Sequence, residues 1–256
     1  MTGLEVAAIL LAGVAAGTIN TVVGSGTLIT FPTLLAVGVP PVTANVSNTI
    51  GLVPGSLSGA VGYRRELAGQ RARLLRLGSA SLLGGVGGAV LLLVLPSSAF
   101  DTIVPVLIAV GVVLVVLGPS ISRRVAVRHQ DRGGIPEHGA PWVWPAVLGT
   151  GVYGGYFGAA QGVLLMAVLG IGVDDDLQRH NATKNVLALL VNGVAAVVFI
   201  AVAEVAWAVV GLIALGAVVG GQIGAGIGRR LPATALRVVI VVVGVVALVA
   251  LLAERV

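Results

Sequence analysis

The sequence predicts an all-α, polytopic integral membrane protein. Its composition is 57% hydrophobic and only 10% charged, whereas about a quarter of the residues of a soluble domain are charged. The mean hydropathy is +1.08. Uncharged apolar runs approach or exceed the roughly 20 residues that cross a bilayer, and they lie at residues 77–94, 102–117, 205–228 and 238–253. These runs lack the polar stripe of a soluble helix.

Charged or Pro/Gly-containing segments divide the chain into apolar runs that predict its helices. In order, the helices are expected at residues 4–23, 27–38, 44–61, 77–95, 102–117, 142–157, 163–173, 186–203, 205–228 and 232–253. We read the first as part of the mature protein rather than a cleaved signal, since no basic segment precedes it. Basic residues are retained on the cytoplasmic side, so a plasma membrane protein would keep loops 64–76 and 122–139 in the cytoplasm.

The expected helices form two similar halves. Residues 1–120 form a first transmembrane repeat, residues 121–141 a basic cytoplasmic loop, and residues 142–256 a second repeat. Each repeat is a helical hairpin followed by three spans, so the second hairpin enters from the opposite face. Many secondary transporters use such inverted repeats with interrupted helices, and they bind substrate near mid-membrane between the repeats. The glycine runs at 84–88 and 220–226 instead predict close helix packing.

Polar side chains gather at the two hairpin tips and at the starts of the helices that follow them. The cluster comprises Asn20, Thr21, Ser25, Thr27, Asn45, Ser47, Asn48 and Thr49 in the first half, and Tyr153, Tyr156, Gln161, Asn181, Thr183, Lys184, Asn185 and Asn192 in the second. Buried polar groups in membranes face a cavity or a partner helix. Glycines and helix starts would also offer free backbone N–H groups to an anion.

From this cluster we predict a substrate site for a small anion. Its members are Asn20, Gly24, Ser25, Gly26, Asn48, Gln161, Gly162, Lys184 and Asn185. Lys184 is the only lysine of the chain. Its side chain either adds charge to the site or extends to the headgroups beside Arg179. The aspartates at 174–176 are expected to form a helix-capping turn.

Other functional classes are disfavoured by the sequence. Without cysteine there is no thiolate metal site, and the three histidines lie in loops or at an interface, so neither metal nor cofactor is expected. The Gly-Ser-Gly at 24–26 lacks a histidine base at membrane depth, which argues against an enzyme. The net charge of +5 comes from basic loops and does not indicate nucleic acid. A non-transporting scaffold stays open; its polar hairpin residues would pair internally and leave no cavity.

Together the hairpin motifs resemble the sulfite exporter TauE/SafE family of membrane permeases. The resemblance is carried by Ala16–Asn20, Gly24–Gly26, Phe31–Pro32 and Asn45–Asn48, and in the second half by Gly154–Gly162 and Leu177–Asn185. It implies an α-helical inverted-repeat transporter that moves sulfite, sulfonates or carboxylates, often outward. Anion uptake and cation-coupled symport are alternatives, and a homo-oligomer stays open.

Overall fold

The computed structural model is all-helical over the residues that it describes, which are 1–130, 139–227, 238, 241–243, 245–246 and 248–249. The helices are α1 (Gly3–Val22), α2 (Thr27–Ala36), α3 (Pro41–Gly62), α4 (Arg71–Val94), α5 (Ser97–Gln130), α6 (Val143–Tyr156), α7 (Gln161–Gly172), α8 (Leu177–Val202) and α9 (Trp207–Ile227). Most of the span expected at 232–253 lies outside the described residues.

Five of these helices are long and apolar enough to cross a membrane, namely α1, α4, α8, α9 and the first part of α5. The fold class expected from the sequence is confirmed. With 10, 14 and 12 residues, α2, α6 and α7 reach only about 15–21 Å at 1.5 Å per residue. They are therefore shorter than the roughly 30 Å hydrocarbon core.

Helices α4, α5 and α8 are longer than the sequence pattern indicated, and α4 begins at Arg71, inside the loop expected at 64–76. Helix α8 begins at Leu177 rather than near residue 186, because the Asp176 side chain accepts hydrogen bonds from the N–H groups of Gln178 and Arg179 and caps the helix. This confirms the capping turn expected at 174–176. Helix α5 continues to Gln130, so the segment expected as a loop at 121–141 starts as helix. No glycine or proline interrupts residues 121–130.

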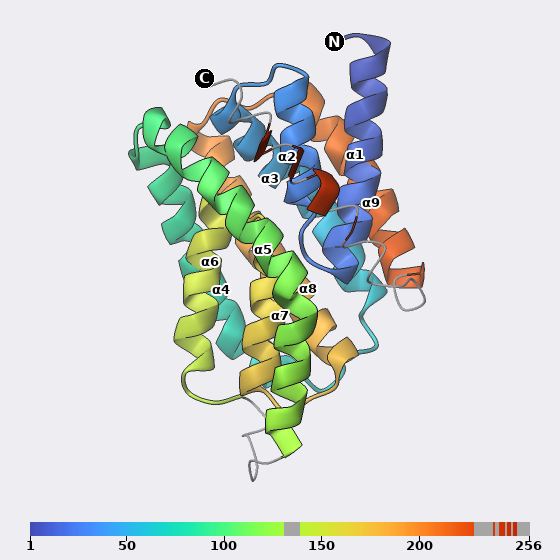
Figure 1. Cartoon of the computed structure of the whole chain (residues 1–256), viewed down its shortest axis with the longest axis vertical. Coiled ribbons are helices and arrows are strands. Elements are labelled where there is room, and N and C mark those ends of the chain that lie inside the picture. The colour runs from blue at the N-terminus through green and yellow to red at the C-terminus, as the bar shows by residue number, and fades with distance from the viewer. Residues whose placement is uncertain (131–138, 228–237, 239–240, 244, 247, 250–256) are drawn as a thin grey trace.

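The helices pack in an arrangement that stays the same when the two halves are exchanged. Helix α1 packs against α9 and α6 against α4, while α3 contacts α9 and α8 contacts α4, with α3 and α8 in contact between them. In Figure 1 the pair α1–α2 lies in the upper part of the molecule and the pair α6–α7 lies lower down. These relations support the inverted repeat, which stays a prediction. The domain boundaries at 120 and 142 also stay predictions.

Glycines let the paired helices approach each other closely, as the runs at 84–88 and 220–226 predicted. A Cβ built on Gly88 would lie 2.1 Å from the carbonyl oxygen of Val152, and one built on Gly220 would lie 2.0 Å from that of Val14. No side chain fits at such distances. The α4–α6 and α1–α9 contacts are therefore backbone against backbone, as small residues permit in membrane helices.

Candidate functional site

The chain breaks between α1 and α2, and between α6 and α7, at glycines that have left-handed backbone angles. Between α1 and α2, Gly24 has φ 88°, and between α6 and α7, Gly158 has φ 76°. Ala160 shares this conformation, with φ 58°, which is uncommon for a residue with a Cβ. The breaks meet where the N–H of Gly162 donates to the carbonyl oxygen of Gly24 at 3.0 Å. The topology thus brings residues 138 positions apart into backbone contact (162 − 24).

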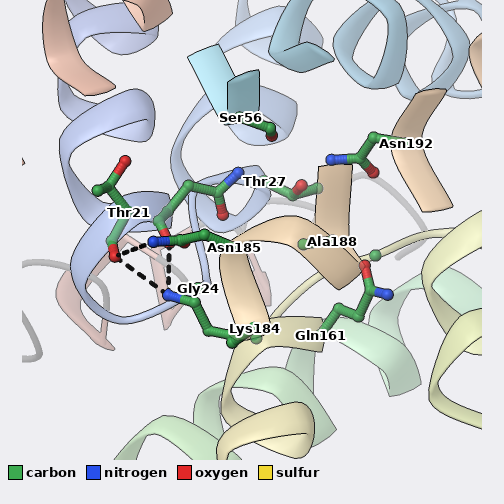
Figure 2. A pocket seen from close by; sticks show the side chains of 12 residues that line it. Thr21, Gly24, Thr27, Ser56, Gln161, Lys184, Asn185, Ala188 and Asn192 are labelled. Carbon is green, nitrogen blue, oxygen red and sulfur yellow. Dashed lines mark hydrogen bonds between the residues drawn. The ribbon is translucent and has the colours of Figure 1, made fainter. Parts of the chain in front are cut away.

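A cavity lies beside this junction of the two breaks. It is lined by Asn20, Thr21, Gly24, Thr27, Ser56, Gly158, Gln161, Gly162, Lys184, Asn185, Ala188 and Asn192. Figure 2 shows Lys184 and Gln161 toward one end and Ser56 and Asn192 toward the other. About 20 Å³ admits the centre of a water-sized sphere. A single water needs roughly 10–15 Å³ by this measure, so the cavity has room for about one water.

Lys184 is directed into this cavity rather than to the headgroups. Its side chain is 0% exposed, and its Nζ donates to the carbonyl oxygens of Asn20 at 2.9 Å and Thr21 at 3.2 Å. The last carbonyls of a helix have no partner within that helix, and the partial negative charge there favours a cation. The ammonium therefore caps the broken end of α1. It has three N–H donors, so two recorded bonds leave one for a ligand.

The end of α1 receives further donors from α8. Asn181 and Asn185 each donate a side-chain N–H to the carbonyl oxygen of Thr21 at 3.2 Å. Asn185 lines the cavity and Asn181 does not. Asparagines and a lysine one turn apart on α8 thus satisfy the carbonyls that the chain break leaves exposed, as broken membrane helices require.

Gln161 provides a second buried donor at the end of the cavity where Lys184 lies (Figure 2). Its side chain is 4% exposed, and its Nε2 has no hydrogen-bond partner among the described residues. A Cβ on Gly154 would lie 2.3 Å from the Gln161 Cδ, so the absence of a side chain at 154 makes room for this amide. A buried unpaired amide is unfavourable by about 1–3 kcal/mol, and a ligand that accepts its N–H would relieve this penalty.

The structure brings together six of the nine residues predicted to bind substrate. Asn20, Gly24, Gln161, Gly162, Lys184 and Asn185 line the cavity. Ser25, Gly26 and Asn48 do not. The N–H of Gly26 donates to the Asn20 Oδ1 at 2.9 Å, and Asn48 hydrogen-bonds Thr30 and Thr27. Ser25 is fully buried and its Oγ has no partner within the described structure.

The expectation of free backbone N–H groups at both helix starts is wrong for α7. There the N–H of Gln161 donates to the carbonyl oxygen of Gly158 at 3.2 Å, that of Gly162 to Gly24, and that of Val163 to Ala160 at 3.0 Å. The positive end of α7 is therefore occupied by protein carbonyls. Side chains, above all Lys184 and Gln161, remain as the donors of the cavity.

Ser56, Gly158 and Ala188 are cavity residues that the sequence reasoning missed. Ala188 and Asn192 follow Lys184 by four and eight residues, so all three share one face of α8. This spacing could have identified Ala188. Figure 2 shows Ala188 among the labelled lining residues.

Comparison with known proteins adds a family to this geometry. The family model described as sulfite exporter TauE/SafE matches residues 9–251. The chain belongs to the TauE/SafE family. A TauE/SafE protein is a membrane transporter, so the chain is a multi-pass membrane transporter and not an enzyme.

The TauE/SafE chain also resembles two curated proteins with similar names. It is 27% identical over 254 residues to the probable membrane transporter protein ORF9 of Sinorhizobium sp., covering 96% of this chain and 92% of the relative. It is 27% identical over 224 residues to the probable membrane transporter protein YfcA of Escherichia coli K12, covering 84% of this chain and 76% of the relative. No solved structure matches the chain.

Proposed function

We propose that this transporter exports a small organic or inorganic anion such as sulfite, a sulfonate or a carboxylate across the plasma membrane. Loops 64–76 and 122–139 would then lie in the cytoplasm. The observation that carries the proposal is the buried cavity at the junction of the two broken helix pairs, in which Lys184 is the one charged lining residue of the described chain.

Charge in the cavity favours an anion over a cation. None of the described lining residues is acidic, and an ammonium taken out of water is stabilised by a counter-charge. The Asn20 Oδ1 already accepts the N–H of Gly26, so the amide of Asn20 offers its N–H₂ group to a ligand. Lys184, Gln161 and Asn20 together supply donors suited to the oxygens of a sulfite, sulfonate or carboxylate.

The membrane potential alone supplies a driving force for export. A cytoplasm-negative membrane favours outward movement of a monoanion by about 2.3 kcal/mol per 100 mV. Anion uptake and cation-coupled symport are separated from this mechanism by imposing each gradient alone on vesicles. The scaffold hypothesis expected no cavity between the halves, and the cavity therefore favours transport.

Flux through purified protein in liposomes tests the proposal. Vesicles are loaded with sulfite, a short sulfonate or acetate, and a potassium diffusion potential of either sign is imposed. We expect efflux when the loaded side is negative and little efflux when the potential is reversed. Gln161→Ala should lower the flux at least 10-fold. Gln222→Ala serves as the matched control, since Gln222 on α9 hydrogen-bonds Ser58 away from the cavity. Equal flux in both variants would contradict the site.

A further inference from the structure

The connection between α3 and α4, residues 63–70, lies across the first turns of α8. Tyr63 is 1% exposed and belongs to a small apolar cluster with Ala182 of α8 and Ala225 of α9, against which Leu67 packs. Ala182 precedes the cavity residue Lys184 by two positions. Residues 63–70 thus pack against α8 at residues 179–183, next to the cavity residue Lys184.

A cluster of polar side chains links residues 63–70 and the start of α4 to α8. The Asp175 carboxylate forms salt bridges with Arg73 Nη1 at 2.6 Å and with Arg179 Nε at 2.8 Å. Arg179 Nη1 also donates to the carbonyl oxygen of Ala68 at 3.1 Å. The Arg73 side chain is only 4% exposed and that of Asp175 13%. Two cations on different helices therefore share one carboxylate.

The same cluster reaches to the residue next to Lys184. Gln70 Oε1 accepts from Arg73 Nη1 at 2.8 Å and from Thr183 Oγ1 at 2.6 Å. Gln70 and Thr183 are 2% and 0% exposed. We define Gln70, Arg73, Asp175, Arg179 and Thr183 as the Asp175 cluster. It extends from the surface turn at 174–176 to Thr183, the residue that precedes the cavity residue Lys184.

The contact of residues 63–70 and the start of α4 with α8 differs in kind from the α1–α9 and α4–α6 contacts. The α1–α9 and α4–α6 contacts are backbone against backbone at glycines; a Cβ on Gly17, for example, would lie 2.3 Å from the Ala217 carbonyl oxygen. When such surfaces separate in a membrane, they lose van der Waals contacts, and water does not replace them. The Asp175 cluster consists of charges, amides and a hydroxyl, and groups of this kind exchange their partners for water when they separate.

The cavity must widen before an anion can enter it. Its space of about 20 Å³ for a water-sized sphere is too small for a multi-atom anion. We propose that the Asp175 cluster is the gate on the basic-loop side of the cavity, and that it opens when residues 63–70 and the start of α4 separate from α8. This inference rests on the proposed function, since a gate has a role only if an anion passes.

A reversible cross-link across the cluster tests the gate, and the cysteine-free chain makes this direct. The double variant Gln70→Cys/Thr183→Cys allows a cross-link between residues 63–70 and α8. The native Gln70 Oε1 and Thr183 Oγ1 lie 2.6 Å apart. The matched control is Ser58→Cys/Gln222→Cys, which joins α3 to α9 at a native contact of 2.8 Å. Each pair is closed with a short bifunctional thiol reagent that a reductant cleaves, and anion efflux is measured before and after cleavage.

We expect the 70–183 cross-link to lower efflux at least 10-fold and cleavage to restore it, while the 58–222 cross-link leaves efflux within 2-fold. Undiminished efflux with 70–183 joined would overturn the gate. Absence of efflux in the uncross-linked and wild-type proteins alike would instead overturn the proposed function.

A single-cysteine variant gives an independent measurement if the double variants fold poorly. Thr183→Cys places a thiol at a fully buried position, where a polar maleimide reacts slowly while the gate is closed. Adding transported anion should raise the labelling rate several-fold, as should Asp175→Asn in the same background. Labelling that neither the anion nor Asp175→Asn accelerates would show that the cluster does not open.

Discussion

The carbonyl oxygen of Gly24 accepts the N–H of Gly162 at 3.0 Å, and this bond joins the two breaks of the chain at the cavity. Neither position has room for a side chain. A Cβ on Gly24 would lie 2.3 Å from the Gly162 Cα, and a Cβ on Gly162 would lie 2.4 Å from the Gly24 Cα. The site therefore depends on two glycines that are distant in sequence and adjacent in space.

Gly162→Ala should force the two breaks apart. Because its new methyl group would meet backbone, we expect a loss of about 1–3 kcal/mol of stability and loss of anion efflux. Gly193→Ala on α8 is the control, since no atom lies within 4 Å of its Cβ position. That substitution should be neutral or stabilising by up to about 1 kcal/mol. Thermal unfolding in detergent and vesicle efflux measure both effects, and equal behaviour of the two variants would contradict the junction.

Two neighbouring glycines of α6 should respond differently to alanine. Gly154→Ala meets the end of the Gln161 side chain, whereas Gly155→Ala meets the carbonyl oxygen of Gly85 at 2.3 Å. A flexible side chain can move and backbone cannot. We therefore expect Gly154→Ala to fold normally with a several-fold higher KM for the anion, and Gly155→Ala to unfold at lower temperature. Normal KM in Gly154→Ala would remove Gln161 from the site.

The charge of Lys184 and its capping of α1 can be measured separately. Lys184→Met removes both, whereas Asn181→Ala removes only a cap bond to the Thr21 carbonyl oxygen. Asn181→Ala should lower stability by about 1 kcal/mol and keep most of the efflux. Lys184→Met should abolish efflux at every anion concentration tested. If both variants transported equally well, the ammonium would serve only as a helix cap.

Asp175 makes stability depend on pH at the acid end. Burial by itself raises the pKa of this carboxyl, but the hydrogen bonds from Arg73 and Arg179 outweigh burial and hold the pKa below its ordinary value of 3.8. The folded pKa is lower than the unfolded one, so the stabilisation is complete above pH 3.8 and is lost as the pH falls through the folded pKa.

Asp175→Asn should accordingly destabilise the protein near neutral pH and lose this effect in acid. We expect a deficit of about 1.5–3 kcal/mol at pH 7, typical of hydrogen bonds to charged groups. Unfolding temperatures of wild type and variant, measured from pH 7 downward in detergent, should begin to converge only as the pH falls below 3.8. A deficit that stays constant with pH would show that the carboxylate charge is not what stabilises the cluster.

Patterns that repeat along the chain predicted much of the fold. Uncharged apolar runs identified the long helices, and the glycine runs at 84–88 and 220–226 identified close packing. The start of α8 was misplaced because all residues from Gln178 to Asn185 except Ala182 are polar, and a hydropathy pattern reads such a stretch as a loop. In the folded chain Asn181, Lys184 and Asn185 contact the end of α1, and Thr183 contacts Gln70, so a polar helix is satisfied inside the protein.

The sequence predicted which residues lie near the site, but not which of their side chains line it. Sequence spacing placed Asn48 and Lys184 near the breaks, but it does not give the rotation of α3 or α8 about their axes. That rotation turns Asn48 toward Thr30 and Thr27 and leaves Ser56 at the cavity. The same limit applied to Lys184. From the sequence its side chain could either extend to the headgroups or line the cavity, and only the position of α1 distinguishes the two.

The sequence by itself determined that this chain is helical, lies in a membrane and interrupts its helices at two polar, glycine-rich places. Those properties follow from local hydropathy and backbone freedom. Only the tertiary structure decided that Gly24 meets Gly162, that Lys184 caps α1 while lining the cavity, and that Asp175 pairs with Arg73 of α4. Each of these contacts joins residues separated by more than 100 positions, and the relative placement of whole helices is a property of their packing rather than of any segment.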